Sequence, residues 1–486
     1  MTTGAGEDTD GSPVGDADLR AALARLVQQL TQEDPAAKRG NPLLPRLDAH
    51  LGVPADEVPV VSQTIDLHRW ADTDIALASI AERDASGELV GIGGGDQRHH
   101  SSLSDLMEQA QWGRFRQGQV DRLNVATGPD SERATVAFGL HLFAFDGAPV
   151  AVLQRAGNRQ YGSESRLEVL SPAPEVASAL LSEVREQAMN HSILRGQVLT
   201  FTDNPYERTA AGITFVRRPD VPAERVVLPD GTLDEIHAHV VGLAQHREQL
   251  RERGQHLKRG ILLYGPPGTG KTHTVRHLIG AQPDTTVIAL TGTQMGHVAA
   301  AAQIARAHQP AMVVLEDCDL IAEDRDHDHF GGGPSPLLFT LLDAMDGLDP
   351  DADVVFLLTT NRVEALEKAL AQRPGRVDLA VEIPLPDEAS RRRLIELYGA
   401  QVDFSEEAVA EAARVAAGSA ASYAKELVRR AVLHAALAGR APGDADLIAA
   451  SEALQDDAAV LTRALLGSTA PGRSDAMGSR DVRPLL

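Results

Sequence analysis

The stretch Gly265-Pro266-Pro267-Gly268-Thr269-Gly270-Lys271-Thr272 fits the pattern G-x-x-x-x-G-K-[ST], in which a glycine-rich turn precedes a lysine and a hydroxyl residue. The apolar run 260–264 before it predicts a buried strand, and apolar residues at helical spacing over 273–279 predict a helix after it. Strand, turn and helix in this order are the context that a phosphate-binding loop needs. The stretch therefore predicts an α/β nucleotide-binding core.

Physical chemistry explains the residue types in this loop. Glycines allow the backbone to curl closely around phosphates, so that several N–H groups converge on them. The N-terminus of the following helix adds free N–H donors and the positive end of its dipole. We expect residues 265–272 to bind ATP, with Lys271 at the β- and γ-phosphates and the hydroxyl of Thr272 on Mg²⁺.

Two further apolar runs end in polar residues. The run 312–315 predicts a buried strand that ends in Glu316 and Asp317, and the run 354–360 predicts another that ends at Asn361. Such a strand places its acids beside the phosphate loop, where one carboxylate can order the metal shell and the other can polarise water. We expect all three polar residues to be catalytic.

A short turn after these strands carries two arginines, Arg373 and Arg376, in the sequence Arg-Pro-Gly-Arg. Guanidinium groups can bind phosphate oxygens through two parallel hydrogen bonds and neutralise the charge of a transition state. Taken alone, the same two residues also fit a surface salt bridge. The companion motifs favour the catalytic interpretation.

With these motifs in this order, residues from about 229 to 437 resemble the AAA family of the AAA+ ATPases. The residues that carry the resemblance are Gly265–Thr272, Glu316-Asp317, Met345-Asp346-Gly347, Thr360-Asn361-Arg362, Arg373-Pro374-Gly375-Arg376 and Ile383-Pro384-Leu385-Pro386-Asp387. The resemblance implies a phosphate-loop α/β core with a parallel sheet and a small α-helical lid. It also implies a ring of identical subunits, usually a hexamer, with ATP bound between neighbours.

The resemblance assigns roles to single residues. Asn361 stands where the family has the sensor that orients the attacking water, and Arg373 and Arg376 stand where it has arginine fingers that reach a neighbour's ATP. The family usually has Asp followed by Glu at the strand tip, whereas this chain has Glu316 followed by Asp317. Position by position, Glu316 takes the metal-side place beside Thr272, and Asp317 takes the water-polarising place.

Two departures concern what the ring would do. Many ring translocases have an aromatic-hydrophobic-glycine pore loop where this chain has Gln294-Met295-Gly296, which puts the threading of an unfolded polypeptide in doubt. No His-Glu-x-x-His motif occurs in the sequence, so the zinc-protease members of the family are not a model for it.

Composition restricts the partners. The sequence has 46 basic and 69 acidic residues, a formal net charge of −23, which argues against general binding to nucleic acid. Its single cysteine cannot form an internal disulfide. No apolar run is long enough to span a bilayer, and the acidic N-terminus lacks the plan of a signal peptide. We therefore expect a cytoplasmic protein without a membrane span.

Composition and periodicity also predict the domain organisation. We expect an α+β recognition or assembly domain to precede the ATPase, with a hairpin turning at Asp146-Gly147 and a helix near 174–188. The expected segments are a disordered acidic N-terminus (1–18), a helical segment (19–59), the α+β domain (60–216), a linker (217–232), the ATPase core (233–386), the helical lid (387–466) and a disordered tail (467–486).

These observations predict an Mg²⁺-dependent AAA-type ATPase that couples ATP binding and hydrolysis to the remodelling of a macromolecule, in the first place a protein client. An alternative is a nucleotide-gated assembly or scaffold protein with slow hydrolysis, which the swapped acids and the altered pore loop favour. A DNA-handling module agrees least with the acidic balance.

Overall fold

A computed structural model of the chain describes residues 43–110, 115–157, 164–202, 212–319, 336–347, 349, 351–363 and 376–455. Its contacts divide the chain into two compact units. The N-terminal unit comprises residues 1–125 and 132–192, and the C-terminal unit comprises residues 126–131 and 193–486. The expected N-terminus (1–18), the first part of the expected helical segment (19–42) and the expected tail after 466 lie outside the described residues.

The N-terminal unit is built on an antiparallel sheet with the strand order β1-β7-β6-β5-β2-β3, in which β4 pairs with β5. The strands are β1 (Val60–Ile65), β2 (Glu88–Gly93), β3 (Arg116–Gly118), β4 (Asp121–Gly128), β5 (Ser131–Phe145), β6 (Ala148–Arg155) and β7 (Ser165–Leu170). The predicted hairpin is confirmed: β5 and β6 pair around Asp146 and Gly147, whose φ angles are 49° and 78°. Positive φ at both turn residues suits a tight hairpin.

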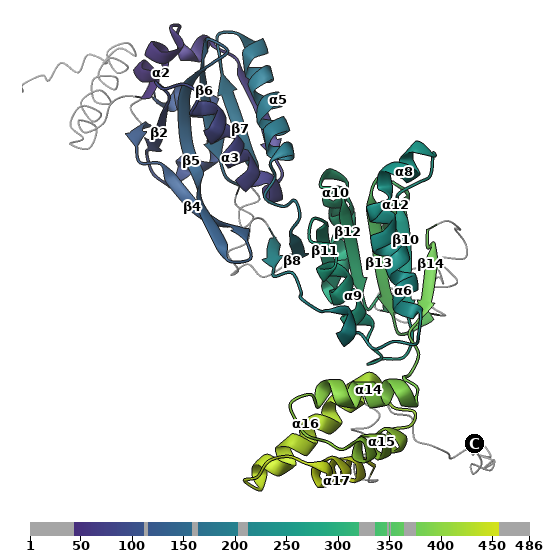
Figure 1. Ribbon diagram of the computed structural model, residues 1–486. Coiled ribbons are helices and arrows are strands. Elements are labelled where there is room, and N and C mark those ends of the chain that lie inside the picture. The colour runs from purple at the N-terminus through teal and green to yellow at the C-terminus, as the bar shows by residue number, and fades with distance from the viewer. Residues whose placement is uncertain are drawn as a thin grey trace, which may run out of the picture. The chain divides into compact units, whose positions relative to one another are not determined.

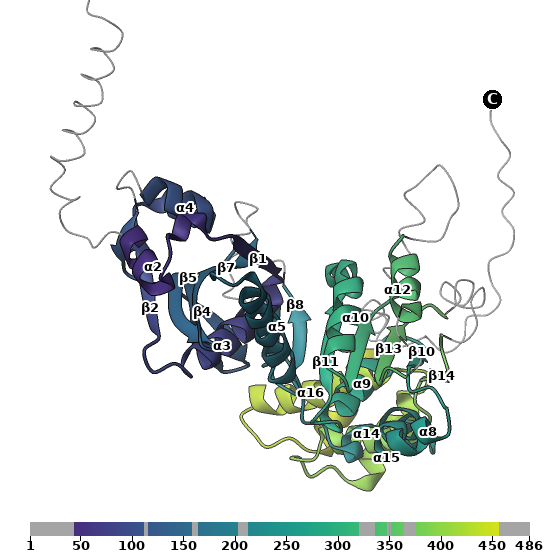
Figure 2. The ribbon, with the colours of Figure 1, turned by 90° about the horizontal axis from the view of Figure 1, so that it is seen from above.

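Helices cover both faces of this sheet, as Figure 2 shows. They are α2 (Leu43–Leu51), α3 (Trp70–Ala81), α4 (Leu103–Ala110) and α5 (Pro174–Asn190), the last confirming the helix expected near 174–188. Residues of β5 alternate between two apolar clusters. Phe138 and Leu140 pack with α2 and α4, while Phe143 and Phe145 pack with α3 and α5. This alternation makes a three-layer unit with the sheet in the middle.

The C-terminal unit contains a second sheet, with the order β14-β10-β13-β12-β11-β8-β9. Its strands are β8 (Val198–Phe201), β9 (Ile213–Val216), β10 (Arg259–Tyr264), β11 (Thr286–Thr291), β12 (Ala311–Glu316), β13 (Val354–Thr360) and β14 (Leu379–Glu382). All paired neighbours are parallel except β8 and β9. Every residue of β13 is buried, which is the pattern of a parallel strand covered on both faces.

Helices lie on both sides of this sheet (Figure 1). One side carries α10 (Val298–Ala307) and α12 (Pro336–Asp346), and the other carries α6 (Thr232–His237) and α9 (Lys271–Gly280). A π-helical turn at Ala238–Gly242 and the short helices α7 (Leu243–Gln245) and α8 (Arg247–Glu252) follow α6. The parallel α/β core predicted from the phosphate loop is confirmed.

Two strands differ from the expected domain assignment. We expected residues 60–216 to form one domain, but β8 pairs with β11 and β9 pairs with β8. The two strands therefore extend the sheet of the C-terminal unit. Sequence alone did not separate the two possibilities, because each strand is only four residues long and an apolar run of that length fits either sheet.

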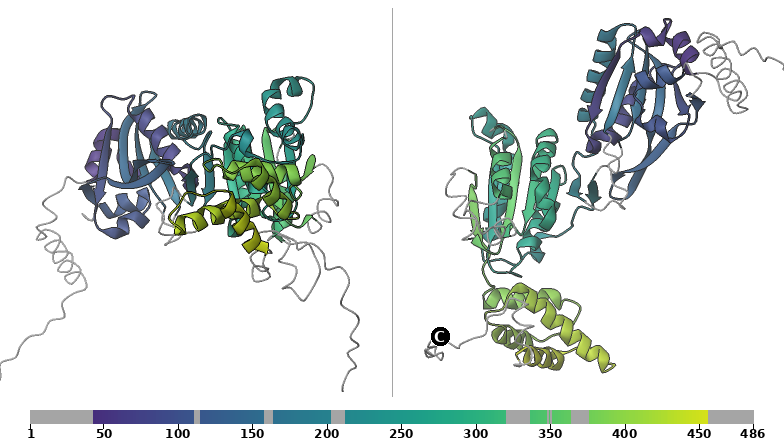
Figure 3. Two further views of the ribbon diagram at one scale, coloured as in Figure 1. Left: turned by 60° about the horizontal axis from the view of Figure 1, so that its bottom comes forward. Right: turned by 180° about the vertical axis from the view of Figure 1, so that it is seen from behind.

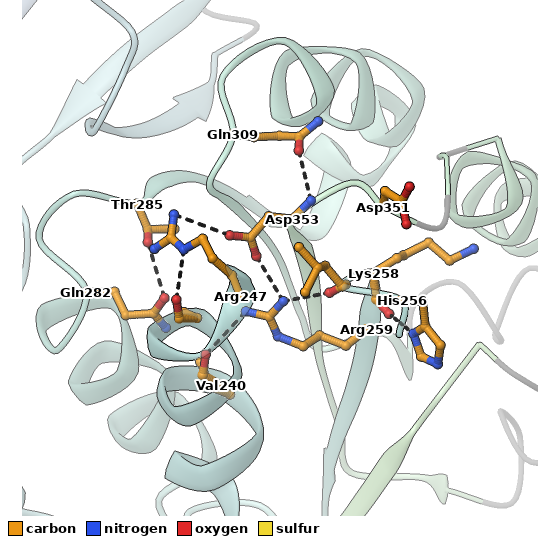
Figure 4. Close-up of polar contacts among 12 residues, drawn as sticks. Val240, Arg247, His256, Lys258, Arg259, Gln282, Thr285, Gln309, Asp351 and Asp353 are labelled. Atoms are coloured by element: carbon orange, nitrogen blue, oxygen red, sulfur yellow. Dashed lines mark hydrogen bonds and ion pairs between the residues drawn. The ribbon is translucent and has the colours of Figure 1, made fainter. Parts of the chain in front are cut away.

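A buried ion pair joins the amino ends of β10 and β13 (Figure 4). Nη1 of Arg259 lies 3.0 Å from Oδ1 of Asp353, and both side chains are 4% exposed. Arg259 also donates to the backbone carbonyls of Leu257 and Val240, so the pair connects the sheet to the π-helical turn. The ion pair lies at the amino ends of the strands, whereas the loops described below follow the carboxyl ends. We therefore assign the pair a role in stabilising the fold.

The residues after β14 form a helical lid, drawn in yellow-green in Figure 3. Its helices are α14 (Glu388–Tyr398), α15 (Glu406–Val415), α16 (Ala421–Leu437) and α17 (Asp444–Gln455). The carboxylate of Asp387 accepts from the backbone N–H of Ser390, and the hydroxyl of Ser405 accepts from that of Ala408, which caps α14 and α15. No helix in the described parts of the chain is both long and apolar enough to cross a membrane.

Candidate active site

The phosphate loop connects the carboxyl end of β10 to the N-terminus of α9. Gly265, Gly268 and Gly270 have φ angles of 141°, 75° and 113°, which glycine adopts at no steric cost. A Cβ atom at Gly265 would lie 2.2 Å from the carbonyl oxygen of Ile383, and one at Gly268 would lie 2.4 Å from the hydroxyl of Ser422. Gly265 therefore needs glycine for space as well as for backbone conformation, because it faces a backbone carbonyl, whereas the Ser422 hydroxyl facing Gly268 can rotate.

Lys271 is 5% exposed, and its Nζ donates to the carbonyl oxygens of Gly265 and Pro266 at 2.7 and 2.9 Å. Burial lowers the pKa of this ammonium group, while the charges of Asp317 and Asp319 oppose the shift. These contacts place a cation inside the curve of the loop. A phosphate in the loop would provide the counter-charge that a buried ammonium favours.

The two acids after β12 face different neighbours. Glu316 is hydrogen-bonded to Thr272, and burial raises the pKa of its carboxyl group. Asp317 has a φ angle of 56°, and its backbone N–H donates to the hydroxyl of Thr359 at 3.0 Å. The hydroxyl of Thr272 and the carboxylate of Glu316 are hard oxygen donors on adjoining positions, so this pair fits an Mg²⁺ ion.

Asp317 and Asn361 line a cavity of about 470 Å³ together with Lys271 and Thr272. Nδ2 of Asn361 lies 3.5 Å from Oδ1 of Asp317. These residues meet because β10, β12 and β13 are parallel neighbours, so their carboxyl ends lie at one edge of the sheet. The structure therefore brings the loop, one acid and the amide together, as the sequence predicted.

The lid and α9 supply further residues that sequence reasoning missed. Tyr398, Ser422 and Lys425 from the lid line the same cavity, as does Arg276 from α9. The backbone N–H of Ser422 donates to the carbonyl of Gly268 at 3.1 Å. Arg276 follows Thr272 by four residues, one helical turn, which is a signal that the sequence did contain. For Tyr398, Ser422 and Lys425, the sequence contained no spacing that relates them to the phosphate loop.

The structure does not place Arg376 at this cavity. Its side chain is 5% exposed and forms an ion pair with Asp346 of the same chain, with Nε 2.8 Å from Oδ1. A Cβ atom at Gly260 would lie 1.9 Å from the carbonyl oxygen of Arg376, so the backbone here is pressed against β10. Arg373 lies outside the described residues. The finger role of both arginines stays a prediction.

The tripeptide Gln294-Met295-Gly296 forms part of a 3₁₀ turn at Gly292–His297. Met295 is 2% exposed and packs in the apolar cluster of α10 and β12. Gln294 completes a capping box with Thr291. The side chain at the centre of the expected pore loop is thus part of the core.

Residues 261–385 match the model of the ATPase family associated with various cellular activities (AAA). The matched range contains the loop, both acids and Asn361, and it covers β11, β12, β13, β14 and most of β10, but not β8 and β9. This chain carries an AAA ATPase domain.

Several known proteins are similar to part of this chain. An ATP-dependent zinc metalloprotease FtsH of Acidothermus cellulolyticus is 33% identical over 250 residues, 48% of this chain and 36% of the relative. The proteasome-activating nucleotidase 1 of Halobacterium salinarum is 29% identical over 273 residues, 53% of this chain and 64% of the relative. The probable 26S proteasome regulatory subunit 4 of Caenorhabditis elegans is 31% identical over 190 residues, 37% of this chain and 42% of the relative. The chain thus matches between about one third and two thirds of the length of these relatives.

The AAA domain accounts for the C-terminal unit better than for the rest of the chain. The family match ends at residue 385, immediately before the lid. The N-terminal unit lies outside the matched range, so the family match leaves its role open.

Proposed function

We propose that this chain is an Mg²⁺-dependent ATPase that hydrolyses ATP to ADP and phosphate and uses the cycle to remodel a protein client. The observation that carries the proposal is the convergence of the phosphate loop, Asp317 and Asn361 on one cavity of about 470 Å³. Loops at the carboxyl ends of parallel strands are where open α/β sheets bind ligands. The volume lies within the range of small-molecule sites in proteins.

Each residue has a proposed part in hydrolysis. The backbone N–H groups of 265–272 and Lys271 hold the phosphates, and Thr272 with Glu316 would hold Mg²⁺, which supplies charge neutralisation when bound. Asp317 polarises the attacking water and Asn361 orients it. Their distance of 3.5 Å allows one water molecule to contact both side chains.

We further propose that the chain assembles into a homo-oligomeric ring, in the first place a hexamer, with each ATP shared between two copies. Arg376 and Arg373 of one copy would then cover the ATP held by the loop of the next. The ion pair with Asp346 holds Arg376 away from its own cavity, so a role at a neighbour's site requires this pair to open.

A mixing experiment tests the shared site. We expect Lys271→Ala and Arg376→Ala each to abolish turnover, the arginine change by about 10³-fold or more with ATP binding near normal. A mixture of the two variants should regain turnover, because some interfaces then combine an intact loop from one copy with an intact arginine from the other. A mixture of Lys271→Ala with Asp317→Asn should stay inactive, since both residues belong to the copy that binds the nucleotide, and every interface then contains one of the two changes on that side.

No recovery in the first mixture, with both variants folded and assembled, would exclude the shared site. Full-rate hydrolysis by Arg376→Ala would also exclude it. Since Arg376 is buried, its variant is checked by thermal unfolding, and Arg373→Ala serves as the second arginine change in the same mixture. Sedimentation of the parent with ATP measures the size of the ring.

The burial of Met295 favours a second candidate, a nucleotide-gated assembly protein with slow hydrolysis. A side chain packed in the core is not available to grip a threaded polypeptide. Turnover measured with and without an unfolded polypeptide separates the two functions. Stimulation by the polypeptide supports remodelling, whereas a slow and unchanged rate supports the assembly function. Affinity capture with the Asp317→Asn form in ATP would then identify the client or the partner.

A further inference from the structure

The carboxylate of Asp319, two residues after Asp317, accepts hydrogen bonds from residues at the end of β13. Its Oδ1 accepts from the hydroxyl of Thr360 and, at 2.9 Å, from the backbone N–H of Asn361. Its Oδ2 accepts from Nδ2 of Asn361 at 2.8 Å. One carboxylate therefore holds both the backbone and the side chain of the amide residue that lines the nucleotide cavity.

This geometry sets the rotation of the Asn361 amide. An ionised carboxylate can only accept hydrogen bonds, so the NH₂ group of the amide must face Asp319. Burial alone would raise the pKa of Asp319, but hydrogen bonds from Thr360 and Asn361 outweigh it and leave the pKa below its usual value. The carboxylate is thus ionised at neutral pH. Among the described residues, Oδ1 of Asn361 has no hydrogen-bond donor as a partner.

We propose that Asp319 is a positioning residue for hydrolysis, which turns the Asn361 amide so that Nδ2 stays beside Asp317 and Oδ1 accepts a hydrogen bond from the attacking water. The inference rests on the proposed ATPase function. A water molecule has two protons, and this arrangement offers it two acceptors, the carboxylate of Asp317 and Oδ1 of Asn361. Both hydrogen bonds then direct the lone pair of the water oxygen along one path.

The chemical step balances with these groups. The water oxygen bonds to the γ-phosphorus, and the bond from that phosphorus to the ADP oxygen breaks. One water proton passes to Asp317, which returns it to the released phosphate. Asp319 itself exchanges no proton, since its carboxylate accepts the three hydrogen bonds from Thr360 and Asn361.

The first variant is Asp319→Asn, which keeps the shape of the side chain and replaces one acceptor by a donor. The new NH₂ group would face Nδ2 of Asn361, so the Asn361 amide is expected to rotate and present its own NH₂ group to the water. We expect kcat to fall by about 10²-fold, the typical cost of a misplaced reacting group, with the Kd for ATP unchanged.

The double variant Asp319→Asn/Asn361→Asp restores the proposed arrangement with the groups exchanged. The new amide at position 319 can donate to the new carboxylate at position 361, whose second oxygen then accepts from the water. Asn361→Asp alone places two carboxylates against each other and should be at least as slow as Asp319→Asn. If the two changes acted independently, the kcat of the double variant would equal the parent kcat reduced by the product of the two single losses. We expect the kcat of the double variant to be higher than this value.

Asp444→Asn is the matched control, because Asp444 also accepts from a backbone N–H, that of Ser405 at 2.8 Å, but lies in the lid on α17. It should keep the parent kcat. If Asp319 only ties β12 to β13, Asp319→Asn will lower the unfolding temperature without lowering kcat. That result, or a double variant no faster than the product of the single effects, would overturn the inference.

The outcomes for the two proposals differ. A parent protein that binds ATP without hydrolysing it removes the proposed ATPase function and this inference with it. A parent that hydrolyses ATP while Asp319→Asn matches its kcat removes the inference alone. If Asp319→Asn does not fold, the comparison of the double variant with Asn361→Asp decides, and equal rates for those two would count against the positioning role.

Discussion

At the scale of single residues, the two lysines that line the nucleotide cavity, Lys271 of the phosphate loop and Lys425 of the lid, differ in burial and hydrogen bonding. Lys271 is buried and donates two hydrogen bonds to loop carbonyls, whereas Lys425 is exposed at the rim of the same cavity. Charge is screened less in a buried position, so the two lysines should contribute unequally to the binding of a triphosphate.

We therefore predict that Lys271→Ala weakens ATP binding about 10- to 100-fold, the equivalent of one charge-assisted hydrogen bond. Lys425→Ala should weaken it much less, because an exposed charge is screened by solvent and salt. Isothermal titration of each variant with ATP and Mg²⁺ measures the difference. Equal losses for the two variants would show that the loop lysine has no special contact with phosphate.

At the scale of elements, the linker before the ATPase core is bonded to the C-terminal end of α9. Arg218 donates to the carbonyls of Ile279 and Gln282 at 2.7 and 3.0 Å, and to those of Gly196 and Thr285 at 3.0 and 2.8 Å. A helix end has carbonyls without helical partners and carries a partial negative charge. The guanidinium group of Arg218 donates hydrogen bonds to such carbonyls, and its positive charge interacts favourably with the negative end of the helix.

Arg218→Ala should therefore lower the free energy of unfolding by about 2 kcal/mol, the scale of hydrogen bonds to a charged group. Its neighbour is the matched control. Among the described residues, Arg217 pairs only with Asp130, and the two side chains are 79% and 66% exposed, so Arg217→Ala should leave the free energy of unfolding unchanged. Urea denaturation of both variants is the measurement. Similar effects for the two changes would contradict the capping role of Arg218.

At the scale of the whole molecule, histidines in both units make stability depend on pH. Burial is the main cause of a lowered pKa at His68, His141, His237 and His273. Between the lowered folded values and the ordinary value near 6.5, the unfolded chain binds more protons than the folded one. The contribution of these histidines to stability is therefore complete above about pH 6.5 and decreases as the pH falls below it.

We predict a lower unfolding temperature at pH 5.5 than at pH 7.5, measured by calorimetry at constant ionic strength. The variant His141→Gln should lose less over the same range, because it removes the most deeply buried of the four groups while offering Gln154 another amide partner. An unfolding temperature that stays constant between the two pH values would refute the prediction.

The sequence by itself determined the features that depend on residues close to one another in the chain. The loop 265–272 carries its own turn chemistry and its own helix start, and the apolar runs before Glu316 and Asn361 are long enough to identify buried strands. Their meeting could be predicted as well, because parallel strands place their carboxyl ends at one edge. The hairpin at Asp146 followed from alternation and turn residues.

Tertiary structure decided what depends on contacts between distant segments. The assignment of β8 and β9 to the sheet of the C-terminal unit follows from the pairing of β8 with β11, almost 90 residues later in the sequence, and from the pairing of β9 with β8. The ion pair of Arg376 with Asp346, the burial of Met295 and the grip of Asp319 on Asn361 have the same origin. Local patterns specify which face of an element is apolar and where it turns, but only packing selects the partner that covers that face.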